Sequence, residues 1–212
     1  YSSAKAIDAQ RFENRTNKIK SDIKNQVDTY IALLRAGRGF IYASQEINKQ
    51  EFSKFVENFD LRNKYPGVLA IGYSKVFTAE EKDSLIAKLK KEGVTDFTVK
   101  PDTPRSIYQA IIYIEPLDER NKIALGFDMS SEETRREAIE TARDSGDYAA
   151  SGRVILIQEK EVDKQAGFLI YIPVYKSGNN PQTVEERRNE IEGFIYIPFR
   201  AGDFVKEIIN EG

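Results

Sequence analysis

The chain has 212 residues, which is enough for one or two modest domains with a buried core. Its 32 basic and 34 acidic residues nearly balance and are interleaved, so no cationic stripe for nucleic acid is present. The absence of cysteine and histidine excludes disulfides, thiolate chemistry and a catalytic triad built on histidine. The sequence has no run of about 18 apolar residues that could span a membrane.

The sequence also lacks the motifs of common cofactor sites. It contains no Asp-x-Asp-x-Asp-Gly loop for calcium and no glycine-rich loop for phosphate, so we expect neither a metal nor a cofactor. The chain opens at Tyr1 without a methionine or a signal peptide. We therefore expect it to be part of a longer protein, and to meet a membrane only through segments outside this chain.

The first 45 residues predict one long helix. Steps of three and four separate its apolar or small residues, which form a narrow seam: Ile19, Ile23, Val27, Tyr30, Leu34, Gly37 and Ile41. A helix of about 40 residues is roughly 60 Å long, more than a compact domain of this size needs. Two interpretations stay open. The whole seam packs on its own domain, or its N-terminal half meets the same helix of a second chain in a homodimer.

The rest of the chain predicts an antiparallel sheet with flanking helices, which is an α+β fold class. About six strands are expected, and seven apolar segments are the candidates: 68–73, 97–100, 107–115, 123–127, 152–158, 167–175 and 191–199. Helices are expected at 50–59, 78–91, 130–144, 183–188 and 204–209, with capping boxes at Thr78 and Ser130 and an N-cap at Asp203.

Asp128 is the residue with the clearest potential for binding. It ends an apolar segment, and Ser130 with Glu133 forms a capping box that starts the next helix without it. A carboxylate that is not needed as a cap can accept hydrogen bonds from a ligand. The alternative is that Asp128 is itself the N-cap of this helix.

Other candidates come from strands that are apolar on both faces, which indicates a sheet covered on both sides. In 167–175, Leu169 and Tyr171 lie on one face, and the sequence does not say which face lines a pocket. Tyr108 and Tyr113, in 107–115, pose the same question. Each of these side chains is either part of the core or a ligand contact.

Several segments together resemble the CHASE domain, an extracytoplasmic sensory domain of receptor histidine kinases and nucleotide cyclases. The resemblance covers most of the chain: Pro66 to Tyr73 with Glu80-Glu81, Gly126 to Met129 with Arg136, Ala142 and Gly146, Gly167 to Tyr175, and Thr183 to Arg187 with Gly193-Phe194, Phe199, Phe204-Val205 and Ile208-Ile209. It implies a stalk helix and a short second helix (1–60), followed by a PAS-like ligand-binding module (61–212). The second, membrane-proximal module of cytokinin receptors is expected to be absent from this chain or cut away.

The resemblance also implies a site. Asp128 matches the family residue that grips the polar edge of the ligand. Ala149, Ala150 and Ser151 lie where the family's backbone contacts a ligand, and small side chains there allow a close approach. The plant members of the family carry bulkier residues at this place, which weighs against a cytokinin as the ligand.

Three functions are compared. The first is a sensor that binds a small organic molecule and passes the signal through its terminal helices to a histidine kinase or cyclase. The second is an interaction module that dimerises a receptor without sensing. The third, an enzyme using carboxylates, is disfavoured because no buried pair of carboxylates is suggested and histidine is absent.

Overall fold

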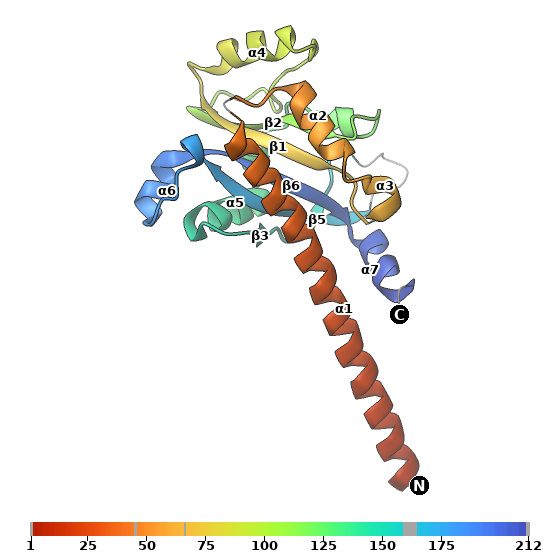
Figure 1. The fold of residues 1–212 in the computed structure, drawn as a ribbon. Coiled ribbons are helices and arrows are strands. Elements are labelled where there is room, and N and C mark those ends of the chain that lie inside the picture. Colours follow the sequence, from red (N-terminus) through yellow and green to blue (C-terminus); the bar gives the residue numbers. More distant parts are fainter. Residues whose placement is uncertain (1, 45, 66, 159–164, 211–212) are drawn as a thin grey trace.

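The computed structural model describes residues 2–44, 46–65, 67–158 and 165–210. A 42-residue helix, α1 (Ser2–Ala43), leads into a six-stranded sheet with helices on both faces (Figure 1). This confirms the α+β class and the long N-terminal helix. Pro66 lies outside the described residues.

The sheet is antiparallel, with the strand order β2-β1-β6-β5-β3, and β4 pairs with β5. The strands are β1 (Ile71–Thr78), β2 (Ile107–Glu115), β3 (Ala149–Ala150), β4 (Val154–Ile155), β5 (Ala166–Tyr175) and β6 (Ile191–Arg200). The three long apolar segments 107–115, 167–175 and 191–199 are therefore strands, as predicted. The first strand begins and ends later than predicted.

The strands expected at 97–100 and 123–127 are wrong. Lys100 and Phe127 form only an isolated bridge, and a 3-10 helix, η1 (Asn121–Ala124), takes up the start of the second segment. Gly126 has φ +80°, and a Cβ there would overlap the Thr98 carbonyl oxygen. This left-handed, crowded backbone interrupts the segment before a ladder can form. The segment 152–158 pairs over only two residues, in β4.

The helices after the stalk are α2 (Lys49–Glu57), α3 (Leu61–Lys64), α4 (Lys82–Lys91), α5 (Glu133–Ser145), α6 (Val184–Glu190) and α7 (Ala201–Asn210). Three predicted helix starts are wrong. Thr78 ends β1, and its N–H donates to the Glu81 carboxylate at 2.8 Å before α4 begins. Glu132, not Ser130, is the N-cap of α5. Asp203 lies within α7, 3.3 Å from Arg200 Nη1, because the helix begins at once after β6.

The sheet is covered on both faces, as the apolar strands indicated. One face packs against α1, α2, α4 and α7, and the other packs against α5. Along β5, alternate side chains divide between these two cores: Phe168, Ile170, Ile172 and Val174 face α1, whereas Leu169 and Tyr171 face α5. The structure thus shows which side chains of β5 face α1 and which face α5.

The stalk helix is embedded over only its C-terminal half. Tyr30 and Leu34 are fully buried, and a Cβ at Gly37 would overlap Ile195 of β6, so α1 lies very close to the sheet there. Towards the N-terminus, Ile19 and Ile23 are each 39% exposed. Figure 1 shows this half projecting away from the sheet, as expected.

Candidate functional site

Asp128 is buried, with 1% of its surface exposed, and lies between β2 and the 3-10 helix η2 (Met129–Ser131). Its Oδ1 accepts hydrogen bonds from the backbone N–H of Gln109 at 3.2 Å and of Ser130 at 3.0 Å. Its Oδ2 lies 3.6 Å from Arg105 Nε. The expectation that serine residues leave Asp128 uncommitted is therefore wrong, because Asp128 itself caps η2.

The serine hydroxyls that were expected to cap the helix serve a buried polar chain instead. Ser130 Oγ donates to Gln109 Oε1 at 3.1 Å, and Gln109 Nε2 donates to Ser74 Oγ at 3.1 Å. Ser131 Oγ donates to the Asp128 carbonyl oxygen at 2.6 Å. The segment after Asp128 is thereby tied across β2 to β1.

A small cavity lies on the α5 side of the sheet, close to this segment. Its volume is about 10 Å³. That is room for about one water molecule. The cavity is lined by Ile111, Ala124, Met129, Arg135, Leu156, Ile157, Gln158, Leu169 and Tyr196. Asp128 is not among these residues, although its neighbour Met129 is.

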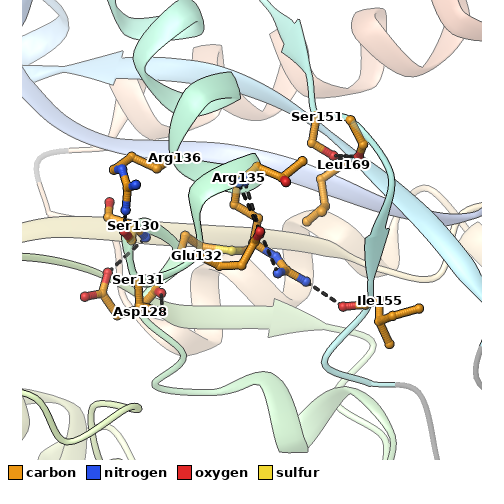
Figure 2. A network of polar contacts seen from close by, with 12 residues as sticks. Asp128, Ser130, Ser131, Glu132, Arg135, Arg136, Ser151, Ile155 and Leu169 are labelled. Atoms are coloured by element: carbon orange, nitrogen blue, oxygen red, sulfur yellow. Dashed lines mark hydrogen bonds and ion pairs between the residues drawn. The ribbon is translucent and has the colours of Figure 1, made fainter.

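Arg135 brings a charge to this cavity from α5. It is 3% exposed, and Figure 2 shows its guanidinium extending from the helix towards the carbonyl of Ile155. Nη1 donates to Glu132 Oε2 at 3.0 Å and Nη2 donates to the Ile155 carbonyl at 2.8 Å. Nε is buried and has no hydrogen-bond partner among the described residues. One donor of a buried cation is thus left available.

Tyr196, on β6, contributes a second such group. The residue is fully buried, and its hydroxyl also lacks a partner within the described ranges. Burial raises the pKa of Tyr196 well above its usual value, so the hydroxyl stays protonated and can donate. Buried polar groups are usually hydrogen-bonded, so two unpartnered ones beside one cavity indicate a missing partner.

Glu132 provides the negative charge nearest to Arg135. Burial acts to raise its pKa, but hydrogen bonds from the backbone N–H groups of Thr134 and Arg135, together with the Arg135 charge, lower it overall. The carboxylate therefore stays ionised and compensates the guanidinium. This pairing explains how Arg135 is tolerated inside an apolar core.

Five of the predicted site residues lie on this side of the sheet or at its edge. Leu169 lines the cavity, and the Tyr171 hydroxyl lies 3.7 Å from Met129 Sδ. Ala149 is buried opposite Tyr171 in the β3–β5 pair, and Ser151 Oγ accepts a hydrogen bond from the Leu169 N–H at 3.0 Å. Ala150 is exposed.

Tyr108 and Tyr113 belong to the core on the opposite face. The Tyr108 hydroxyl accepts a hydrogen bond from the Arg105 N–H at 2.9 Å, and the Tyr113 hydroxyl donates to Glu92 Oε2 at 2.7 Å. The sheet separates these two tyrosines from Leu169 and Tyr171. One pocket on one face of the sheet cannot include both groups.

The sequence did contain a signal for Arg135, which the prediction missed. Arg135 shares the spacing of the buried helix face formed by Ala138, Ile139 and Ala142, three, four and seven residues further on. A charged residue in register with an apolar face is either paired or functional. Tyr196 had no comparable signal, because its strand is apolar on both faces.

Within the described ranges, no group of three or more acidic side chains is placed to hold a metal ion. Among the helices that the structure describes, none is both long and apolar enough to cross a bilayer.

Comparison with known proteins identifies the family. The model of the CHASE domain matches residues 45–212, so the chain belongs to the CHASE domain family. It is therefore an extracytoplasmic sensory domain, part of a receptor. The matched region begins after α1, so the family assignment rests on the sheet, its flanking helices and α7.

A solved structure also resembles the chain. It is the periplasmic sensory domain of the Campylobacter jejuni chemoreceptor Tlp1, with 11% identity and a TM-score of 0.48. The match covers 90% of this chain and 59% of the other, so this chain spans about three fifths of that domain's length. Among curated proteins, no sequence matches the chain.

Proposed function

We propose that this CHASE domain senses a small organic ligand at the cavity between α5 and the sheet, on behalf of a receptor histidine kinase or nucleotide cyclase. The observation that carries the proposal is the pair of unpartnered buried groups, Arg135 Nε and the Tyr196 hydroxyl, beside the same cavity. A ligand would supply the acceptors that both groups lack.

The ligand class follows from the lining. Both unpartnered groups are donors, so the ligand needs acceptor atoms, such as carbonyl oxygens or ring nitrogens. The remaining wall is mainly apolar, with Met129, Leu156 and Leu169. This combination suits a compact, mostly apolar molecule with one polar edge.

Binding would have to enlarge the cavity. Sites for organic ligands usually measure about 300–1,000 Å³, and the cavity in this conformation holds about one water. The ligand would therefore displace α5 from the sheet or move Met129, whose flexible side chain adapts easily. A ligand that binds only the enlarged state shifts the population towards it, which is how a signal could arise.

The predicted site residues enter this proposal with different roles. Leu169 and Tyr171 would form the apolar wall, and Ala149, Ala150 and Ser151 would border it at β3. Asp128 would hold Met129 in place through the cap of η2. The direct grip of Asp128 on a ligand stays a prediction, because a ligand would compete with Arg105 for Oδ2. We do not place Tyr108 and Tyr113 in this pocket.

The test is a thermal-shift and calorimetric screen of small amines, nucleobases and carboxylates. A true ligand at 100 times its Kd should stabilise the fold by about 2.7 kcal/mol. Tyr196→Phe removes only the unpartnered hydroxyl, so it should fold normally and bind about tenfold more weakly. Tyr73→Phe, a buried tyrosine on the other face, is the matched control. Equal losses in both variants would reject the pocket.

A second function is supported by the small size of the cavity. A nearly filled core at the pocket position is what an interaction module without a ligand would have. In that case, no compound in the screen would stabilise the parent chain, and Tyr196→Phe would leave receptor output unchanged.

We also propose that the projecting half of α1 mediates a homodimer. Its exposed apolar residues continue the spacing of the embedded seam and include Phe12 at 75% exposure, with Ile19 and Ile23. Apolar residues in such a register on an uncovered helix suit a two-stranded coiled coil.

A further inference from the structure

A second and larger cavity lies where the embedded end of α1, the end of α5 and the segment before α6 meet. Its volume is about 290 Å³, and none of its lining residues is shared with the cavity at Arg135. The embedded end of α1 contributes Arg38 and Tyr42, the segment around α6 contributes Asn179 and Arg187, and β5 contributes Tyr175.

Two guanidinium groups line this cavity without a carboxylate partner. Arg38 makes no hydrogen bond or ion pair with any residue in the described ranges. Arg187 Nη1 donates to the Asp144 carbonyl oxygen at 2.9 Å, and within the described ranges no acidic oxygen lies within 4.0 Å of it. The carboxylate of Asp144 is already bound by Arg143 and Arg188. Most donors of both groups therefore remain available.

Tyr175 lines the same cavity as Arg38 and Arg187. Its hydroxyl donates to the Arg143 carbonyl at 2.7 Å, and its backbone N–H donates to the Tyr42 hydroxyl at 3.1 Å. Burial raises the pKa of Tyr175 to about 12, while the positive charges of Arg187 and Arg38 both act to lower it. The guanidinium groups thus act on the same hydroxyl from two different helices.

We infer that this cavity binds a small anion bearing carboxylate or phosphate oxygens, held by Arg38 and Arg187. Arginine suits such groups because its planar donors match two anion oxygens at once. The volume of about 290 Å³ is near the lower limit for organic ligands, so a compact acid fits. The site goes beyond the proposed sensing pocket, since the anion would bridge the stalk helix to α5 and α6 directly.

The experiment measures binding of succinate, citrate and inorganic phosphate to the whole chain by calorimetry at low salt. At least one of these probes should bind, which also identifies the source chemistry as carboxylate or phosphate. Arg38→Gln and Arg187→Gln should each weaken that binding at least tenfold, roughly the loss of one charged hydrogen bond. Raising the salt should weaken it further because ions screen the attraction.

Arg35→Gln is the matched control, because Arg35 lies on the same helix but pairs with Asp147 at 3.2 Å and does not line the cavity. It should bind the anion like the parent. Tyr196→Phe should also bind normally, which separates this site from the sensing pocket. The inference is overturned if none of the three anions binds the parent, or if Arg35→Gln loses as much affinity as Arg38→Gln. If Arg187→Gln fails to fold, the affinity of Arg38→Gln for the anion tests the inference by itself.

Discussion

The carboxylate of Asp128 joins two segments that are distant in sequence. It accepts one backbone hydrogen bond from β2 and one from η2, and it does so at 1% exposure. The Gln109 N–H is buried, so it would lose its acceptor if the carboxylate were removed. Asp128 therefore contributes to folding, whatever it also contributes to a ligand.

We predict that Asp128→Ala lowers the free energy of unfolding by about 2–4 kcal/mol, because the buried Gln109 N–H and the half-buried Ser130 N–H both lose their charged acceptor. Urea denaturation measures this directly. Asp128→Asn keeps one acceptor oxygen and should lose less. If Asp128→Ala unfolds at the same urea concentration as the parent, the hydrogen bonds that Asp128 accepts do not stabilise the fold. The residue is then available for binding alone.

Glycine at position 126 is required for two reasons, and the chain offers a control that separates them. Gly126 and Gly93 both have positive φ, at +80° and +85°. A Cβ at Gly126 would overlap the Thr98 carbonyl, whereas a Cβ at Gly93 would meet nothing within 4 Å.

Gly93→Ala should therefore cost only the left-handed strain, about 1–2 kcal/mol. Gly126→Ala should cost clearly more, because a backbone oxygen cannot move aside as a side chain can. Unfolding midpoints of the two variants test this. Equal losses would mean that the Thr98 segment relaxes without cost.

At the level of elements, the sequence predicted the features that depend on local pattern. It missed the features that depend on contacts between distant segments. The strand at 107–115 was predicted with its bounds, because a long apolar run between turns has few alternatives. The prediction of a strand at 123–127 was wrong, because the local spacing of apolar residues does not reveal the close approach of Thr98 to Gly126. The prediction that Asp128 is uncommitted was wrong partly for the same reason, since one of its two backbone donors, the Gln109 N–H, comes from another strand.

The stalk helix makes a prediction about assembly. The double variant with Ile19→Asp and Ile23→Asp should abolish self-association and leave the monomer folded, since both residues are partly exposed and belong to the projecting half. Sedimentation and circular dichroism measure the two effects. Self-association of the isolated chain is expected to be weak without a membrane to raise the effective concentration. A parent chain that stays monomeric at millimolar concentration would contradict the homodimer.

The junction of α5 and α6 makes a prediction about acid. Hydrogen bonds from Arg188, and then from Arg143, hold the pKa of Asp144 well below its usual range. A carboxyl group with a lowered folded-state pKa stabilises the fold above its unfolded pKa of about 4, and this stabilisation is lost as the pH falls further.

The difference in unfolding free energy between the parent and Asp144→Asn should therefore shrink from about pH 5 to about pH 2. Urea titrations across this range measure it. Asp147→Asn is the control, because its pair with Arg35 is about half exposed and contributes little. A difference that stays constant with pH would show that Asp144 acts through packing rather than charge.

For the whole molecule, the embedded half of the stalk helix and the module share one hydrophobic core. Tyr30 of α1 lies 4.8 Å from Phe199 of β6 and 6.3 Å from Phe204 of α7, measured between ring centroids. Phe52 of α2 belongs to the same core. The division into a stalk with a short second helix (1–60) and a ligand-binding module (61–212) stays a prediction, and the embedded half of α1 packs in the same core as the sheet.

Removing residues 1–22 tests this arrangement. Described side chains in this segment are exposed or half-buried, so the shortened chain should unfold within about 0.5 kcal/mol of the parent, as for changes at a surface. Denaturant unfolding gives the comparison. A shortened chain that lacks cooperative unfolding would show that the projecting half stabilises the module.

A helix anchored at one end and free at the other works as a lever. Residues 6–29 extend about 36 Å beyond the anchored half at 1.5 Å per residue, so a rotation of about 5° at the anchor moves the free end by about 3 Å. Arg38 and Tyr42 belong to the anchored end, so an anion at their cavity would act close to the pivot. In a pair of such stalks, two small rotations of opposite sense would change the spacing of the free ends by about 6 Å, a displacement as large as one helical turn.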